Sequence, residues 1–208
     1  MLLKQENITI SSFCTPDKIR DLSFESFFGS HEPEREKGIE YYSILGKKES
    51  LIKAASQPDA NVTLAFTDNK EIIALSILQY PDSSERWLRV GDRIMMEVSV
   101  IEVSRKWRSM GIAGELLRLL MEHPLKEDRI FYMVGYSWTW DLNGTGISAT
   151  DYRQMMTALF SLHGFQVFKT NEPNILLRPE NLFMSRIGAN ISEAVKKQFK
   201  MVRFNLDL

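Results

Sequence analysis

The residues best suited to chemistry lie in one short stretch, EVSRKWRSMGIAGELLRLL, at positions 102–120. An apolar strand pattern ends at Val103 and a helical pattern begins near Gly111, so a helix starts shortly after a strand. The first N–H groups of a helix have no intrahelical partner and lie at the positive end of its dipole. Gly111 and Gly114 have no side chain and Ala113 has a small one, so an anion can approach the backbone closely. The pattern predicts a pyrophosphate site formed by Arg108, Ser109, Met110, Gly111, Ile112, Ala113 and Gly114, with Arg105 and Lys106 adding positive charge.

The same residues exclude two other phosphate loops. No Gly-Lys-Ser/Thr follows, as a Walker loop requires, and Gly111 is not preceded by the G-x-G of a dinucleotide-binding turn. On spacing alone, a tight strand-to-helix turn with surface cations remains the alternative to a phosphate site.

The run RSMGIAGELL, residues 108–117, resembles the R/Q-x-x-G-x-G/A motif of the GNAT acetyltransferase superfamily. That family carries the motif between its fourth strand and third helix, which agrees with its place here. SLHGF at 161–165 is similar to the family's x-x-x-G-F junction, and the resemblance covers roughly residues 60–170. It implies acetyl-CoA as co-substrate, with the pyrophosphate on the backbone of residues 109–114.

The resemblance also implies a place for the pantetheine arm of acetyl-CoA. The strands predicted at 95–103 and 129–138 should diverge to admit the arm between them. Backbone groups near Ile101 and Val103 would then pair with the pantetheine amides instead of the neighbouring strand.

A closer likeness extends over most of the chain. It is carried by five blocks, which are ERW at 85–87, IEV at 101–103, YSWTWDLNGTGISATDYRQMM at 136–156, NEPNI at 171–175 and RPENLFMSRIG at 178–188. These blocks resemble the AcuA family of acetoin-utilisation acetyltransferases within the superfamily. The resemblance implies acetyl transfer to a lysine of acetyl-CoA synthetase, which switches that enzyme off.

Two carboxylates in the predicted strand 95–103 are candidates for the general base that an amine nucleophile needs. Strand alternation places Glu97 on the face shared with Val103, whereas Glu102 points the other way. Glu97 also lies six residues before Val103, where GNAT enzymes of the histone-modifying type carry their base. Glu97 is therefore the first choice and Glu102 the second, and a carboxylate paired with an arginine or an amide is the alternative for either.

One position departs from the GNAT pattern. Many GNAT enzymes place a tyrosine, as proton donor to the thiolate, four residues before the glycine of x-x-x-G-F, and this chain has Phe160 there. Tyr136 and Tyr152 are candidate substitutes, and a CoA thiolate can also leave without a dedicated acid.

Aromatic residues after the strand predicted at 129–138 suggest an acceptor site. Trp138, Trp140 and Asp141 lie where GNAT substrates enter, and two rings with a carboxylate could hold a lysine stem and attract its ammonium group. Alternation in an extended chain would put both rings on one face, which also suits simple packing.

The elements that position these residues follow one another in an α/β order. We expect strands at 6–13, 61–66, 71–80, 95–103, 129–138 and 165–168, and helices from Pro16 to about 28, at 34–57, 110–123, 149–164 and 191–199. Residues 81–93 read as a loop, and Pro179 opens a short element of undecided type. The segment 95–138 forms a βαβ unit. With the resemblance, this order predicts a GNAT-type mixed, mostly antiparallel sheet with flanking helices and a C-terminal helix.

Composition limits the class of protein. The 208 residues fit a single domain, 1–208, with a net charge of −1 that makes nucleic acid an unlikely partner. No run approaches the length of a membrane span, and the lone Cys14, more readily a packed thiol than a nucleophile, allows no internal disulfide. We therefore expect a cytoplasmic protein. His31, His123 and His163 lack metal-ligand spacing, so no metal is expected.

Three functions remain open at this stage. The first is a protein lysine acetyltransferase, the second a small-amine N-acetyltransferase, and the third an acyl-CoA-binding regulator without turnover.

Overall fold

The computed structural model describes residues 7–23, 48–142 and 144–206. Contacts divide the chain into two compact units, which are residues 1–79 with 100–121 (unit 1) and residues 80–99 with 122–208 (unit 2). Unit 1 contains β1 (Ile8–Ser11), α1 (Pro16–Arg20), α3 (Lys48–Ala55), β2 (Asn61–Thr67), β3 (Ile72–Gln79), the end of β4 (Met95–Val103), η3 (Arg105–Trp107) and α4 (Ile112–Leu120). Unit 2 contains η2 (Arg86–Val90), the start of β4, β5 (Ile130–Gly135), η4 (Ser137–Thr139), α5 (Ala149–Ser161), β6 (Gln166–Val167), α6 (Pro173–Leu176), β7 (Leu182–Ile187) and α7 (Glu193–Arg203).

The strands of unit 1 are ordered β1-β2-β3-β4. β1 and β2 pair antiparallel, with Ile8 opposite Thr67, and β2 and β3 pair antiparallel, with Asn61 opposite Leu78. The predicted hairpin is confirmed, because a short turn with Lys70 at φ 63° joins its two strands.

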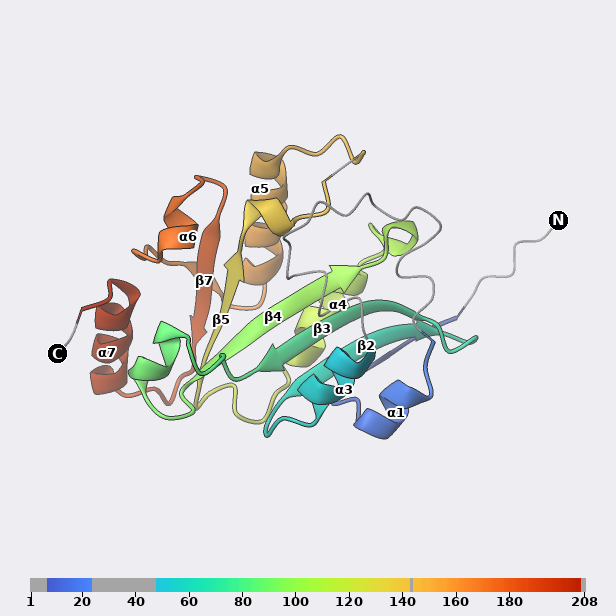
Figure 1. Cartoon of the computed structure of the whole chain (residues 1–208), viewed down its shortest axis with the longest axis horizontal. Coiled ribbons are helices and arrows are strands. Elements are labelled where there is room, and N and C mark those ends of the chain that lie inside the picture. Colours follow the sequence, from blue (N-terminus) through green and yellow to red (C-terminus); the bar gives the residue numbers. More distant parts are fainter. Residues whose placement is uncertain (1–6, 24–47, 143, 207–208) are drawn as a thin grey trace. The chain divides into compact units, whose positions relative to one another are not determined.

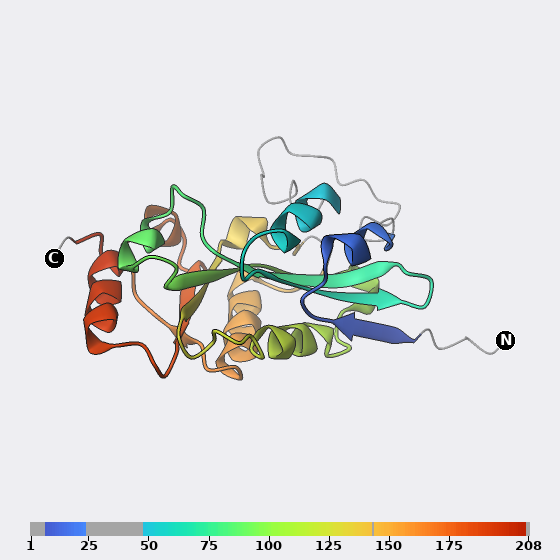
Figure 2. The same ribbon diagram turned by 90° about the horizontal axis from the view of Figure 1, so that it is seen from below.

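Helices cover both faces of the β2–β3 hairpin, as Figure 2 shows. Leu51 of α3 and Ile19 of α1 pack with Leu64 and Leu75 on one face. On the other face, the apolar side of α4 packs against Ala65, Ile73 and Ala74 through Ile112 and Leu116. This amphipathic packing confirms α4 and fixes the direction in which its first turn points.

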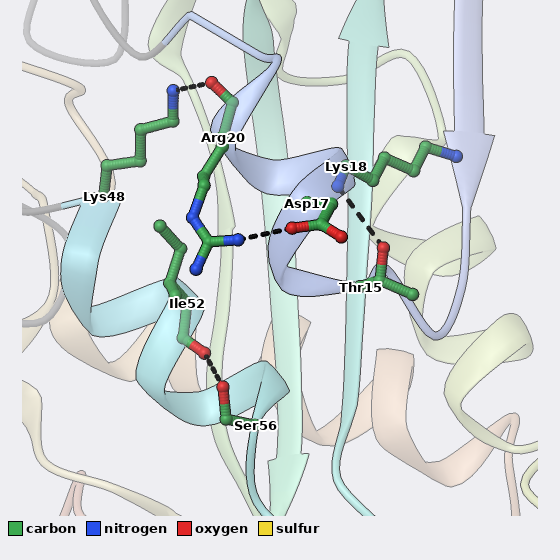
Figure 3. A network of polar contacts seen from close by, with 7 residues as sticks. All are labelled: Thr15, Asp17, Lys18, Arg20, Lys48, Ile52 and Ser56. Carbon is green, nitrogen blue, oxygen red and sulfur yellow. Dashed lines mark hydrogen bonds and ion pairs between the residues drawn. The ribbon is translucent and has the colours of Figure 1, made fainter.

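A polar network joins α1 and α3 (Figure 3). Thr15 caps α1 by accepting a hydrogen bond from the Lys18 N–H at 3.3 Å. Asp17 and Arg20 form an ion pair, and the Lys48 ammonium donates to the Arg20 carbonyl.

The helix predicted from Pro16 to about residue 28 ends early. The Ser23 N–H donates to the Lys70 carbonyl at 2.7 Å, and the Ser23 carbonyl accepts from the Ile72 N–H at 2.8 Å. Ser23 therefore bridges to the edge of β3 instead of continuing α1. Residues 24–47, which include much of the helix predicted at 34–57, lie outside the described residues.

Unit 2 has the strand order β4-β5-β7-β6. β4 and β5 pair parallel, which confirms the βαβ connection, whereas β5–β7 and β7–β6 pair antiparallel. The last strand in the sequence, β7, thus lies beside β5 (Figure 1) and between β5 and the two-residue β6. The predicted mixed, mostly antiparallel sheet is confirmed.

An aromatic cluster forms the core of unit 2. The ring of Trp87 stacks on Phe183 at 4.5 Å between centroids and lies 5.5 Å from the ring of Tyr132. Phe199 and Val202 of α7 join the same cluster, so the C-terminal helix completes this core. α7 begins with a Ser192 cap and runs further than the predicted 191–199.

Three expectations about unit 2 need correction or completion. β5 ends at Gly135, not at residue 138, because the Ser137 N–H donates to the Asn181 side chain at 2.7 Å and the chain turns into η4. The predicted loop 81–93 contains η2. The undecided element after Pro179 is β7, an internal strand between β5 and β6.

Candidate functional site

The predicted phosphate loop is an open turn between β4 and α4. β4 ends at Val103, and the next residue is fixed because the Ser104 N–H donates to the Ile73 carbonyl of β3 at 2.9 Å. Trp107 then packs beside Ile112 and Leu116, which anchors the turn on unit 1. The strand, the turn and the helix therefore follow one another as the sequence predicts.

Gly111 is the N-cap of α4, with φ 78° and no side-chain cap. A Cβ atom at Gly111 would have no atom within 4 Å, so the space above this residue is open. The Glu115 N–H donates to the Gly111 carbonyl at 3.2 Å, and the N–H groups at the start of a helix have no partner within it. Backbone donors, the helix dipole and open space are the features that an anionic group needs, and binding of a pyrophosphate here stays a prediction.

The other residues of the loop differ in exposure. Ser109, at φ 64°, and Met110 are exposed, as are Arg105 and Lys106. Arg108 is partly buried, and its Nε donates to the Val103 carbonyl at 3.0 Å. Arg108 therefore ties the loop to the end of β4 as well as bringing positive charge.

Glu97 lies in the part of β4 that belongs to unit 2. Its register partner on β5 is Tyr132, and Met95, two residues earlier, packs with Trp87 and Tyr132. Since alternate residues of a strand share a face, the Glu97 side chain points to the side of this aromatic cluster.

The environment of Glu97 suits a general base. Burial, and secondarily the negative charge of Glu85, raise the pKa of Glu97 from 4.5 to about 7. A base works best when its pKa lies near the working pH, so Glu97 has the property that amine chemistry requires. Glu102, the second candidate, lies in the part of β4 that belongs to unit 1 and is partly buried.

The pairing of β4 with β5 stops early. The parallel ladder runs from Met95 opposite Ile130 to Glu97 opposite Tyr132. β5 continues to Gly135, beyond the last position of this ladder. The divergence of the two strands stays a prediction. Ile101 is partly buried and Val103 packs with Trp107, and their role beside pantetheine stays a prediction.

The predicted acceptor residues have partners within the chain. Trp138 lies in η4, where its ring stacks on Tyr136 at 4.9 Å and faces the Arg178 guanidinium at 5.6 Å. Trp140 packs on Tyr152 at 4.9 Å between centroids. The strand alternation assumed for the two rings is wrong, because β5 ends before both. Asp141 is partly buried, and its role toward an amine stays a prediction.

Phe160 has a packing role. Its side chain is 0% exposed and meets Phe165 edge-on at 5.1 Å, and Gly164 at φ 83° follows the end of α5. The x-x-x-G-F junction is therefore structural here.

Glu85 acts electrostatically on Glu97, and Tyr132 is the register partner of Glu97 on β5, although the sequence singled out neither residue. Glu85, Glu97 and Glu172 all act on the hydroxyl of Tyr136, which the sequence names as a candidate proton donor. Glu85 and Glu172 do occur in the ERW and NEPNI blocks, so the resemblance contained a signal that spacing did not.

No group of three His, Cys, Asp or Glu side chains that could hold a metal occurs in residues 7–23, 48–142 and 144–206. Over those same residues, no helix is both long and apolar enough to cross a membrane.

The sequence has relatives along its whole length, although no protein-family model matches it. It is 28% identical to acetoin utilization protein AcuA of Bacillus subtilis, over 95% of this chain and 89% of that protein. The protein of the same name from Bacillus licheniformis is 28% identical over 96% of this chain and 90% of its own.

Solved structures share the fold. An acetoin utilization protein from Exiguobacterium sibiricum matches 98% of this chain and 97% of its own with a TM-score of 0.80 at 23% identity. A GNAT-family acetyltransferase from Streptococcus pneumoniae matches 88% of this chain and 100% of its own, with a TM-score of 0.54 at 16% identity. The PaiA N-acetyltransferase from Thermoplasma acidophilum, solved with coenzyme A, matches 87% of this chain and 99% of its own, with a TM-score of 0.50 at 14% identity.

The fold is that of the GNAT acetyltransferases, as the loop motif predicted. The chain is also a homologue of the curated AcuA proteins. Two of the structures that share its fold are named as acetyltransferases.

Proposed function

We propose that the chain is an acetyl-CoA-dependent protein lysine N-acetyltransferase that acetylates acetyl-CoA synthetase and thereby inactivates it. The uncapped start of α4 carries the acetyl-CoA part of this proposal, since the open turn at Gly111 offers backbone donors to a pyrophosphate. The synthetase comes from the likeness to the AcuA family. A cytoplasmic location and a single functional domain spanning 1–208 belong to the same proposal.

The chemistry proposed is direct attack of the lysine amine on the thioester. The amine nitrogen bonds to the carbonyl carbon, the carbon–sulfur bond breaks, and CoA leaves as a thiolate that takes a proton from water. The lysine nitrogen loses two protons in all. The first leaves the ammonium group before or during attack and passes to Glu97, directly or through a water molecule, and the second leaves the nitrogen after attack and passes to water. With a pKa raised to about 7 by burial and by Glu85, Glu97 is about half ionised at neutral pH and can both accept and release that proton.

The test uses the whole chain, acetyl-CoA and purified acetyl-CoA synthetase. We expect release of CoA, acetyl-lysine on the synthetase by mass spectrometry, and loss of synthetase activity. Glu97→Gln is the matched inactive control, and a panel of small amines is the second acceptor arm. Acetylation of small amines alone would refute the protein acceptor. Acetyl-CoA binding by calorimetry without CoA release from any acceptor would refute catalysis and favour a regulator.

A further inference from the structure

Three carboxylates of unit 2, from three different segments of the sequence, act electrostatically on one group, the hydroxyl of Tyr136. Glu85 is the N-cap of η2, and Glu172 is the N-cap of α6, where its side chain accepts from the Ile175 N–H at 2.7 Å. The next residue after Glu85 joins the two segments, because the Arg86 guanidinium donates to the Asn171 side chain at 2.7 Å. The two N-caps are therefore held close together.

Glu97 and two tyrosines belong to the same place. Tyr132, the register partner of Glu97, contacts the ring of Trp87, which follows Glu85 by two residues. Tyr136 hydrogen-bonds to the side chain of Asn174, two residues after Glu172.

The carboxylates act on one another as like charges. The pKa of Glu85 is raised first by burial, then by Glu172 and Asp82, and Arg86 lowers it by less than any of these raises it. Burial, Glu172, Glu85 and Glu97 raise the pKa of Tyr136 to about 12, against the hydrogen bond from Asn174. Negative charge thus dominates around these groups, and a bound cation would relieve the repulsion.

The hydroxyl of Tyr132 points to a ligand independently of the charges. The Tyr132 side chain is 1% exposed, and among the described residues its hydroxyl has no hydrogen-bond partner. Buried polar groups without a partner are uncommon in proteins and call for an explanation. Burial, and then the negative charges of Glu97 and Glu85, raise the pKa of this hydroxyl, and Tyr132 is the register partner of Glu97 in the β4–β5 ladder.

We propose that Glu85 and Glu172, together with the Tyr132 hydroxyl, form the binding site for the ammonium group of a primary alkylamine, and that this site delivers a lysine side chain to Glu97. The inference rests on the proposed function. An ammonium group offers three N–H donors, which matches two carboxylates and one hydroxyl oxygen. Glu85 is exposed and Glu172 is partly buried, so the acidic groups lead from solvent toward the partly buried Glu97.

The experiment measures kcat and KM for the purified acetyl-CoA synthetase and for a lysine peptide, with the whole chain. Glu85→Gln and Glu172→Gln remove charge but keep a side-chain oxygen, so the cap of α6 survives. We expect KM for either acceptor to rise roughly 3–10-fold in each variant, with kcat and the KM for acetyl-CoA little changed. Raised salt should increase the KM of the wild type for these acceptors more than that of the double variant, which carries both Glu85→Gln and Glu172→Gln. Glu193→Gln, an exposed carboxylate on α7, is the matched control.

A second variant separates recognition from structure. Tyr132→Phe removes a buried hydroxyl that has no partner, so the free protein should be as stable as the wild type or more stable, while KM for the lysine acceptors rises. A purely structural hydroxyl would instead lower stability when removed and leave KM alone.

The outcomes distinguish the two proposals. Suppose that the wild type acetylates lysine. If the KM for lysine acceptors in Glu85→Gln and Glu172→Gln then equals that of the wild type, or rises no more than it does in Glu193→Gln, the ammonium site is refuted while the function stands. If the wild type acetylates no lysine at all, the function fails and the ammonium site fails with it.

Discussion

Replacing Glu97 by glutamine changes two measurable properties of the chain for one physical reason. Burial and the charge of Glu85 raise the pKa of this carboxyl from 4.5 to about 7. One pKa unit corresponds to about 1.4 kcal/mol, so keeping Glu97 ionised in the folded chain costs up to ~3 kcal/mol. Glutamine has nearly the same shape and never ionises.

The stability effect has a definite sign. Because the pKa of Glu97 is higher in the folded than in the unfolded chain, the folded chain binds more protons between pH 4.5 and about 7. The free energy of unfolding of the wild type therefore falls as pH rises through that window. Glu97→Gln lacks this loss, and we expect it to be more stable than the wild type at pH 8 by up to ~3 kcal/mol, with a much smaller difference at pH 4. Urea unfolding at the two pH values measures this.

The activity effect runs the other way. We expect kcat to fall by ~10²–10³ at neutral pH, with acetyl-CoA affinity unchanged by calorimetry. The wild-type kcat/KM should rise with pH and level off above about 7, where the pKa of Glu97 lies. The plot of kcat/KM against pH for Glu97→Gln should lack this rise around pH 7. Higher pH should partly restore the variant, because the lysine then deprotonates without help.

Glu102→Gln is the control, and three results would refute the reasoning about Glu97. Full activity in Glu97→Gln with loss in Glu102→Gln would make Glu102 the base. Full activity in both variants would mean that positioning alone drives the reaction. An equal free energy of unfolding for wild type and Glu97→Gln at pH 8 would show that the carboxyl is not perturbed.

Gly111→Val should weaken acetyl-CoA binding at least ~10-fold by calorimetry, because the added carbons enter the open space above the loop. Gly144→Val, at a glycine that is equally open with φ 71°, is the control and should leave the affinity unchanged. An equal loss of affinity in both variants would refute the pyrophosphate assignment. Phe160→Tyr buries a hydroxyl at a position that is 0% exposed, so the free energy of unfolding should fall by ~1–3 kcal/mol in thermal or urea unfolding while kcat does not rise. A higher kcat with unchanged stability would instead show that a tyrosine at this position acts as a proton donor. Trp138→Ala removes the ring stacked on Tyr136 and should raise KM for a lysine peptide severalfold at constant acetyl-CoA affinity; an unchanged KM would leave that ring a packing role alone.

Local patterns predicted the elements that carry their own signal. MMEVSVIEV is a long apolar-dominated run, and β4 spans it at 95–103 as predicted. The spacing of Ile112, Leu116 and Leu120 predicted α4 and, with Gly111, the loop that precedes it. Both the motif and its backbone geometry arise within a few neighbouring residues.

Long-range contacts decided the rest. LFMSRI at 182–187 is too short to show its type, and it becomes β7 because β5 pairs with it. β5 stops at Gly135 because Asn181, far along the chain, binds the Ser137 N–H. The grouping of Glu85 with Glu172 likewise depends on a contact between distant segments, the bond from Arg86 to Asn171, so no spacing rule could predict it.

The place of β7 has a consequence for synthesis of the chain. Translation produces β5 well before β7, so β5 leaves the ribosome with only one of its two neighbours. Until residues 182–187 emerge, the backbone N–H and C=O groups on that side of β5 are unpaired, and the aromatic surface around Tyr132 lacks Phe183. A premature stop before Leu182 thus removes an internal strand instead of trimming a tail. The nascent chain is therefore open to mispairing at β5 until residues 182–187 have emerged.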